Sequence, residues 1–167
     1  YWGHLSGACN FFTGDNTFRL NGEKFEVPKT LNGRPFYTTH AKGDFALKFL
    51  DEAAAREKPF LLYVAFNAPH YPLHAPEADV KKWDGSYDGG WDALRRTRYA
   101  KQLKLGIISE NTKLSPRPAH IPAWDSLGAK EQQWEADRME VFAAMVEVMD
   151  AEIGRIVARL KAKGEWE

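Results

Sequence analysis

Residues 58–76 read KPFLLYVAFNAPHYPLHAP, and this stretch decides the fold class. The seven residues from Phe60 to Phe66 are all apolar, do not alternate with polar residues and follow a proline. Such a run is typical of a strand buried on both faces, in a mostly parallel sheet with helices on each side. We therefore predict an α/β fold in which this segment is the one central buried strand, flanked by helices.

A helix is predicted immediately before this strand. It begins near Thr38 or Thr39, because either hydroxyl can cap a helix N-terminus. Apolar residues then recur at helical spacing, at Ala46, Phe49, Leu50 and Ala53. Lys58-Pro59 ends the helix, since proline cannot continue it. A helix followed by a buried strand is half of an α/β unit.

A small β-hairpin is predicted near the N-terminus, between Thr17 and Val27. Its two short strands flank Asn21-Gly22. This pair tolerates positive φ at both central positions of a type I′ turn, which makes it a strong hairpin signal.

Two further helices are predicted downstream. The first runs from Trp91 to Leu105 and ends at Gly106, and an irregular segment from Ser109 to Trp124 follows. The second runs from about Ala129 to Lys163, and Gly164 is suited to end it. An apolar stripe at helical spacing, expected to face the core, consists of Phe142, Met145, Val146, Met149, Ile153, Ile156, Val157 and Leu160.

This inventory of elements is incomplete for an independent α/β domain. A doubly wound sheet needs more than one central strand. We therefore expect the other strands to lie outside this chain, and we interpret residues 1–167 as an internal segment of a larger domain. The chain also opens on Tyr1 rather than on methionine.

The composition is that of a globular protein and excludes several classes. Lys and Arg total 23 and Asp and Glu total 23, so the net charge favours neither nucleic acid nor an anionic membrane. The longest apolar run, from Phe60 to Phe66, is far shorter than the ~20 residues of a membrane span. No phosphate-binding loop, dinucleotide-binding glycine motif, nucleophile-elbow serine motif or Cys-x-x-Cys pair is present. The oligomeric state is not readable from the sequence.

The candidate functional residue is His70, just beyond the carboxyl end of the predicted strand. Open α/β sheets bind ligands in the crevice outside the carboxyl ends of their strands. Pro69 and Pro72 restrict the backbone around the imidazole, as a pre-organised catalytic side chain requires. The ring could donate a hydrogen bond to an anionic oxygen or a proton to a leaving group. The alternative is a loop histidine that only hydrogen-bonds the backbone.

His74 stands four residues after His70, and this spacing resembles a metal-binding pair. The spacing brings two rings to one side only on a helix, which the intervening prolines forbid. We interpret His74 as structural or solvent-facing, so the sequence predicts no metal ligand. His4, His40 and His120 lack partners at ligand spacing and stay unassigned.

Two charged features are interpreted as surface. The basic stretch of the first downstream helix consists of Arg95, Arg96, Arg98, Lys101 and Lys104. It could attract an anion, but a charge run on a helix is more often a solvated face. Asp150 lies at the rim of the apolar stripe, where a helix-edge salt bridge is expected.

Residues 58–76 closely resemble the middle segment of arylsulfatases, the formylglycine-dependent sulfatases of the alkaline phosphatase superfamily. Residues 87–91, YDGGW, and residues 138–147, RMEVFAAMVE, resemble further blocks of the same family. The blocks occur in the family's order and span nearly the whole chain. The resemblance implies a partial alkaline-phosphatase-like fold.

The resemblance carries one functional position into this chain. His70 matches the histidine of the family's Ala-Pro-His motif, so it is expected to contact the sulfate ester and to assist the leaving oxygen. The family's nucleophile is formylglycine, made from the cysteine of a C-x-P-x-R motif, and calcium helps to hold the sulfate. Cys9 does not match, because Phe11 stands at the proline position and Thr13 at the arginine position. Both the formylglycine and the calcium ligands are therefore expected outside this chain.

These matches imply a hydrolase that cleaves sulfate monoesters, with a sulfated small molecule or a sulfated glycan as substrate. The alternatives are a phosphate or phosphonate ester hydrolase of the same superfamily and a non-catalytic binding protein that retains the fold. The resemblance also suggests a periplasmic or secreted protein. Residues 1–167 alone are expected to show no turnover, since they lack the nucleophile.

Overall fold

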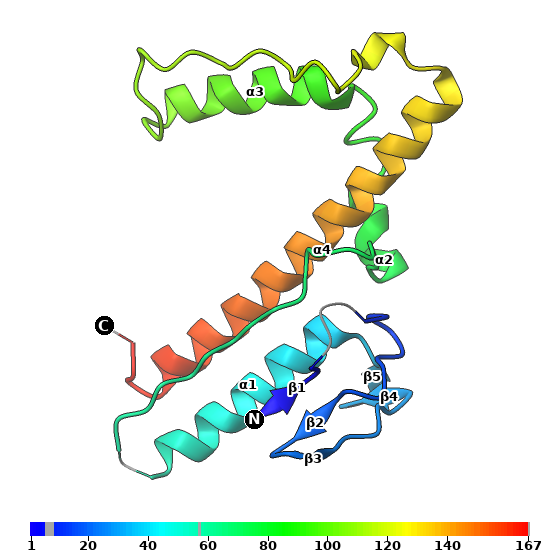
Figure 1. Cartoon of the computed structure of the whole chain (residues 1–167). Coiled ribbons are helices and arrows are strands. Elements are labelled where there is room, and N and C mark those ends of the chain that lie inside the picture. The colour runs from blue at the N-terminus through cyan, green and yellow to red at the C-terminus, as the bar shows by residue number, and fades with distance from the viewer. Residues whose placement is uncertain (6–8, 57, 167) are drawn as a thin grey trace.

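The computed structural model describes residues 1–5, 9–56 and 58–166. A long helix, α4 (Ala129–Ala162), runs the length of the molecule, and α1 (Thr38–Ala54) packs along its C-terminal half (Figure 1). Two small sheets lie against the other side of α1, while α3 (Gly90–Lys104) projects from the opposite end of α4. The two long helices and the segments packed on them form the core. None of the described helices is long and apolar enough to cross a membrane.

The predicted N-terminal hairpin is present. It consists of β2 (Arg19–Leu20) and β3 (Glu23–Lys24), and Asn21-Gly22 between them has φ of 52° and 94°. β1 (Trp2–Gly3) pairs antiparallel with β2 to complete a three-stranded sheet.

A second hairpin escaped the sequence analysis. It joins β4 (Thr30–Leu31) to β5 (Arg34–Pro35) through Asn32-Gly33, whose φ values are 50° and 80°. The same Asn-Gly signal predicts both turns.

The helix predicted near Thr38 is confirmed as α1, but the predicted cap is wrong. The residue at the cap position is Tyr37, and no side chain caps the helix. The Thr38 hydroxyl and backbone N–H instead both donate to the carbonyl of Phe11, at 3.0 and 2.8 Å. The threonine therefore fastens the N-terminal loop to α1.

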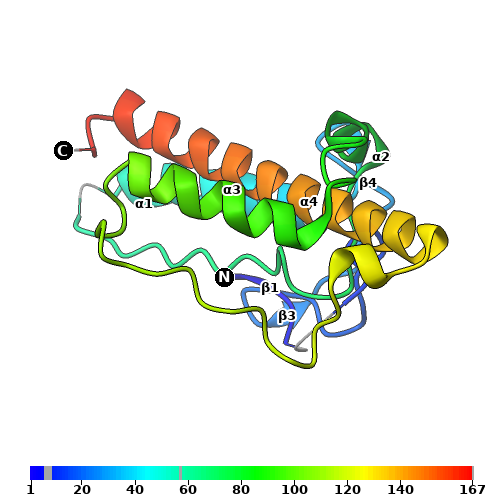
Figure 2. The same ribbon diagram turned by 90° about the horizontal axis from the view of Figure 1, so that it is seen from above.

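The segment predicted as the central strand is extended but unpaired. In the described structure, no backbone hydrogen bond involves Phe60 to Phe66. Leu61 and Tyr63 are 95% and 87% exposed, whereas Leu62 and Val64 are half-buried, so two-sided burial is not observed. The segment lies across one side of the α1–α4 pair (Figures 1 and 2), and the helices cover only the face turned toward them. A strand ladder also requires a neighbouring strand, which the described chain does not supply.

The two downstream helices are confirmed as α3 and α4. Gly106 and Gly164, just beyond them, have φ of +67° and +72°. The predicted apolar stripe of α4 is confirmed only in part. Met145 and Ile156 are buried, but Val146 and Ile153 are exposed, and the buried face instead includes Ala144, Val148 and Glu152. Three short helical segments were not predicted: α2 (Glu77–Val80), η1 (Lys81–Trp83) and η2 (Trp124–Ser126).

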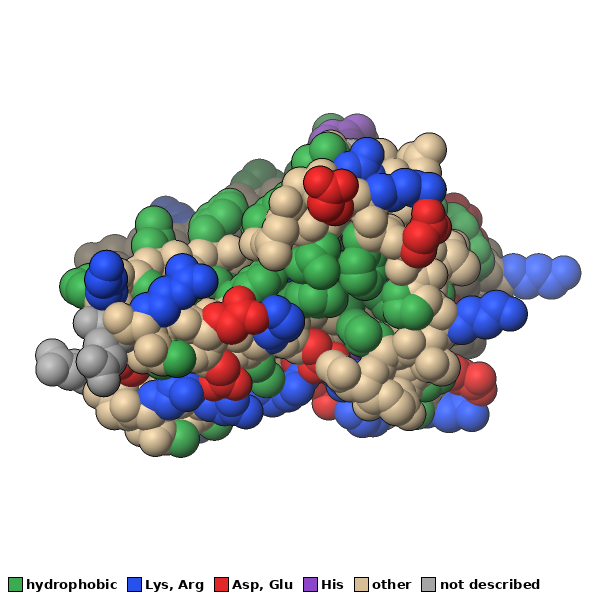
Figure 3. Space-filling model, turned by 90° about the horizontal axis from the view of Figure 1, so that it is seen from below, with side chains coloured by type: hydrophobic (Ala, Val, Ile, Leu, Met, Phe, Trp, Pro, Cys, Tyr) green, Lys and Arg blue, Asp and Glu red, His purple; other side chains and the backbone are tan. Residues whose placement is uncertain are grey.

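Apolar side chains remain open on the surface. Figure 3 shows hydrophobic side chains gathered in a hollow on one face, bordered by acidic and basic residues. Tyr63, Val146 and Ile153 are among the exposed large apolar residues. Exposed apolar surface of this kind marks places where another surface packs.

Candidate functional site

The loop that follows the extended segment presents His70 to solvent. The backbone N–H of His70 donates to the carbonyl of Asn67 at 2.7 Å, which turns the chain, and Ala68 between them is buried. His70 itself is exposed. The tight backbone turn therefore fixes the position of a solvent-exposed side chain.

One hydrogen bond indicates which ring nitrogen of His70 carries the proton in the neutral imidazole. Its Nδ1 lies 2.6 Å from the carbonyl oxygen of Tyr71. A carbonyl only accepts hydrogen bonds, so Nδ1 carries the proton and Nε2 is the free ring nitrogen. In the neutral ring Nε2 is an acceptor, and it becomes a donor only when the imidazole is protonated.

A second histidine, His4, contacts the same loop from the N-terminal segment. The side-chain amide of Asn67 donates to Nε2 of His4, although 63 residues separate the two. His4 is half-buried, and its ring lies 5.2 Å from the ring of Phe18. The amide oxygen of Asn67 is buried and has no hydrogen-bond partner in the described structure. The contact joins the start of the chain to the turn that carries His70.

His74 holds the far side of the loop in place. Its Nδ1 accepts from the backbone N–H of Phe11 at 3.3 Å, and its carbonyl accepts from the Tyr37 hydroxyl at 2.8 Å. Burial raises the pKa of Tyr37, so its hydroxyl stays a donor. The half-buried His74 ring also packs edge-on against Phe11. These contacts tie the loop to α1 and to the N-terminal loop.

Cys9 and Lys42 lie beneath the N-terminal segment. Burial raises the pKa of the Cys9 thiol, which is 6% exposed and therefore poorly placed to act as a nucleophile. Burial lowers the pKa of Lys42. Within residues 1–5, 9–56 and 58–166, no three His, Cys, Asp or Glu side chains are grouped to hold a metal ion.

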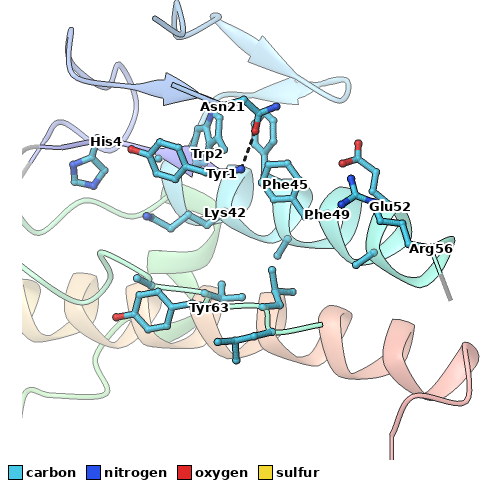
Figure 4. Close-up of a pocket in the computed structure, with 17 residues that line it drawn as sticks. Tyr1, Trp2, His4, Asn21, Lys42, Phe45, Phe49, Glu52, Arg56 and Tyr63 are labelled. Carbon is cyan, nitrogen blue, oxygen red and sulfur yellow. Dashed lines mark hydrogen bonds between the residues drawn. The ribbon is translucent and has the colours of Figure 1, made fainter. Parts of the chain in front are cut away.

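An open groove of ≈ 650 Å³ lies beside the extended segment rather than around His70. Figure 4 shows it between α1, which contributes Lys42 and Phe45, and the segment that carries Tyr63. At its end, the amino group of Tyr1 donates to the side chain of Asn21 at 2.9 Å. The groove runs along the side of the 60–66 segment that has no hydrogen-bonded neighbour in the described structure. We therefore interpret it as a gap left by the packing of the fold.

An ionic cluster around two buried carboxylates, Glu152 and Asp44, fixes α1 to α4. Its centre is Glu152 of α4, which is 2% exposed and lies 2.8 Å from Nδ1 of His40. Arg155 pairs with both Glu152 and Asp44, and Arg34 lies 2.9 Å from Asp44. Sequence analysis missed this cluster, because His40 and Glu152 are 112 residues apart. By contrast, no ion pair involves Asp150 in the part of the chain that is described, so the salt bridge expected there is not observed.

Asp44→Asn is expected to lower the free energy of unfolding by about 1–3 kcal/mol near neutral pH, because it removes the charge held by two guanidinium groups. Burial alone would raise the pKa of Asp44, but hydrogen bonds from Asn32, Arg155 and Arg34 outweigh it and hold the pKa below the ordinary value. Such a carboxylate stabilises the fold above its unfolded pKa, and this contribution is lost as pH falls through the folded pKa.

Denaturant unfolding of the full-length protein near neutral pH and in acid measures this effect. The difference between wild type and Asp44→Asn should shrink as the solution is acidified. Asp125→Asn, at an exposed position of η2, is the matched control and should change stability by less than about 0.5 kcal/mol. A loss for Asp44→Asn that is the same at every pH would contradict the charge argument.

The loop that carries His70 follows an extended apolar segment that belongs to no sheet in the described structure. The sequence model of the sulfatase family matches residues 5–167, and the chain belongs to that family. The predicted fold class is thereby confirmed: the chain has part of the sulfatase fold, a mixture of helices and small sheets.

Relatives of known sequence and structure agree with this assignment. The chain is 42% identical over 126 residues to an uncharacterized sulfatase of Schizosaccharomyces pombe, covering 72% of this chain and 22% of the relative. It is 34% identical over 147 residues to an arylsulfatase of Klebsiella aerogenes, and the match covers 88% of this chain and 30% of the relative. The chain is also similar to the crystal structure of Ps i-CgsB in complex with k-i-k-neocarrahexaose, with a TM-score of 0.57 and 20% identity. This match covers 99% of the present chain and 29% of the Ps i-CgsB chain. The chain therefore spans less than a third of the length of these proteins.

Proposed function

We propose that the full-length protein hydrolyses sulfate monoesters, converting R–OSO₃⁻ and water to R–OH, sulfate and a proton. One observation carries the proposal. In a chain of the sulfatase family, the loop beyond the extended segment presents an exposed imidazole whose Nε2 has no partner among the described residues. This nitrogen is available to an ester oxygen, whereas the side chains of Asn67 and His74 are engaged by the N-terminal part of the chain.

The proposed role of His70 is to act on the oxygen that bridges sulfur and the alcohol. Negative charge develops on this oxygen as the S–O bond breaks, so a donor placed there stabilises the transition state more than the bound ester. Because Tyr71 accepts from Nδ1, the donor is the protonated imidazole acting through Nε2. After transfer of its proton to the alcohol oxygen, the ring returns to the neutral form.

The nucleophile and the metal ion of this proposal lie outside the residues described. Formylglycine would attack sulfur and calcium would hold the sulfate oxygens, but neither group fits here. Cys9 is buried and its neighbours Phe11 and Thr13 do not match the required motif. The described carboxylates likewise form no group suited to a cation. The chemistry assigned to this chain is therefore limited to His70.

The relatives support the substrate class that we propose. The Klebsiella aerogenes relative is an arylsulfatase, and Ps i-CgsB was crystallised with k-i-k-neocarrahexaose, an oligosaccharide. These two proteins support a sulfated aromatic molecule or a sulfated glycan as the substrate of the full-length protein.

Assays of the full-length protein with 4-nitrophenyl sulfate, 4-nitrophenyl phosphate and a 4-nitrophenyl phosphonate test the proposal. We expect the sulfate ester to be cleaved fastest. Faster release of 4-nitrophenol from the phosphate or phosphonate ester would favour the alternative hydrolase. Saturable binding of the sulfate ester without turnover would favour a binding protein.

A further inference from the structure

The residues from Gly90 to Ala123 form a projecting unit, called here the basic arm. It consists of α3 and the return segment 105–123, which runs back along the helix (Figure 1). Gly90 is the one fully buried residue of α3. The arm projects from the N-terminal end of α4, away from α1 and the small sheets (Figure 1).

The arm is held together through one face of α3. Across this face, Trp91 Nε1 donates to the Pro122 carbonyl (3.1 Å), and Arg95 donates to the Ser115 carbonyl (2.9 Å). The Tyr99 hydroxyl donates to the Thr112 carbonyl (2.7 Å), and Arg117 forms an ion pair with Asp92 (3.1 Å). Trp91, Arg95 and Tyr99 follow one another at intervals of four residues, so they share a face of the helix. The return segment thus occupies this face.

The charge of the arm differs from that of the chain as a whole. The arm contains seven Lys and Arg residues against two acidic residues, Asp92 and Glu110, in a chain whose charges balance. Only Arg117 of the seven forms an ion pair within the described structure. Outside the arm, nine of the sixteen Lys and Arg residues do so. The charge of the arm is therefore largely unneutralised by the described chain.

Four of these cations lie along the exposed part of α3: Arg96, Arg98, Lys101 and Lys104. Arg96, Lys101 and Lys104 fall on the half of the helix turned away from the return segment, and Arg98 flanks them. Arg96 to Lys104 spans roughly 12 Å along the axis, at the rise of an α-helix. Arg96 has a longer-range electrostatic effect on Asp92, which is already bonded to Arg117 and the Trp124 N–H. The four cations are not needed to fold the arm.

We propose that the basic arm binds a polyanionic chain bearing several sulfate groups, such as a sulfated glycan, while one of its esters is hydrolysed. The inference rests on the proposed sulfatase function and deepens it by assigning a surface that binds one of the two proposed substrate classes. A single sulfate ester engages one or two cations, whereas a row spread over the helix matches a ligand with repeated anionic groups. Guanidinium and ammonium groups both bind sulfated oxyanions, and the bound counter-ions that they displace favour association.

A nucleic acid fits this surface less well. Proteins that bind single strands stack bases on exposed aromatic side chains. The aromatic residues of α3, Trp91 and Tyr99, are engaged by the return segment instead. The outer face therefore offers charge without stacking surfaces, as suits a sulfated polymer.

Binding of dextran sulfate to the full-length protein tests the inference, with unsulfated dextran and duplex DNA as comparison ligands. The test variant carries Arg96→Gln, Arg98→Gln, Lys101→Gln and Lys104→Gln. The control carries Lys29→Gln, Lys58→Gln, Lys130→Gln and Lys161→Gln, which remove the same charge from exposed positions outside the arm. Affinity is measured at low and at raised salt, and cleavage of 4-nitrophenyl sulfate is measured in parallel.

We expect the arm variant to bind dextran sulfate about tenfold to a hundredfold more weakly at low salt, and the control to change by less than about threefold. Cleavage of 4-nitrophenyl sulfate should be unchanged in the arm variant. Equal losses in the two variants, no binding by wild type, or tighter binding of DNA than of dextran sulfate would overturn the inference. Loss of the sulfatase function would show separately, as absent turnover of 4-nitrophenyl sulfate by wild type.

Discussion

Replacing His70 with alanine in the full-length protein is expected to lower kcat by about 10²–10⁴ for a sulfate ester whose alcohol leaves poorly. The reason is the free Nε2 of an exposed ring, whose Nδ1 is held by the Tyr71 carbonyl. Alanine removes the donor but leaves the turn between Asn67 and residue 70, which is a backbone contact. The loss should therefore appear in kcat more than in KM.

The leaving group provides the internal control for this expectation. An alkyl sulfate needs help at the departing oxygen, whereas 4-nitrophenyl sulfate releases a stable anion and needs little. The defect of His70→Ala should be much smaller on the second ester. A near-normal kcat on the alkyl ester would return His70 to the structural interpretation.

His74→Ala is the matched variant on the same loop. Its ring accepts from Phe11 and packs against that residue, so its loss loosens the loop without touching the reacting oxygen. We expect a modest drop in thermal stability and a much smaller change in kcat than for His70→Ala. Equal losses of kcat would show that disturbance of the loop, rather than loss of the donor, explains both variants.

The local features of this fold could be predicted from sequence, since short-range physics determines them. Asn21-Gly22 forces positive φ at two successive residues, and the prolines around His70 forbid a helix there. The position of His70 beyond an extended apolar run follows from the same local reasoning. Asn32-Gly33, with φ of 50° and 80°, obeys the same rule in the second hairpin.

Other features depend on partners far along the chain, and sequence patterns do not contain them. Glu152 is buried because His40 and Arg155 satisfy its charge, so a charged residue occupies the core face of α4. An apolar stripe therefore predicts only part of the buried face of that helix. The contact between His4 and Asn67 likewise exists only once the N-terminal segment has folded onto the loop. No signal at either residue marks it in advance.

The Phe60 to Phe66 segment shows that a sequence pattern can also predict a feature that the described chain does not form. Its apolar run predicts a buried strand, but the segment is not a strand in the described chain, where it has no hydrogen-bonded neighbour. Leu61 and Tyr63 stay exposed because burial of a second face needs a further layer. Pattern reasoning thus predicts what a segment requires, and the surrounding chain determines whether that requirement is met.

Gly90→Ala is expected to destabilise the basic arm by about 3–5 kcal/mol, the largest effect on stability that we predict. Gly90 has φ of +71°, where a side chain is strained, and an added Cβ would lie 1.9 Å from Cδ2 of Trp124. Trp124 is 7% exposed and packs edge-on against Trp91, with ring centroids 4.9 Å apart. The methyl group must therefore expel the Trp124 ring or unwind the first turn of α3.

Gly89→Ala is the matched control for this variant, one residue away in the same Gly-Gly pair. Gly89 has φ of −72°, and an added Cβ would meet only the Ala93 side chain at 3.9 Å, an ordinary contact. We expect its stability to change by less than about 1 kcal/mol.

Limited proteolysis within residues 105–123 and tryptophan fluorescence of the full-length protein report the state of the arm. Gly90→Ala should be cut much faster and should expose Trp124 to solvent, while Gly89→Ala behaves like wild type. Equal behaviour of the two variants would mean that the close approach of Trp124 does not fix the arm. In that case the arm would be held by the contacts between α3 and the return segment.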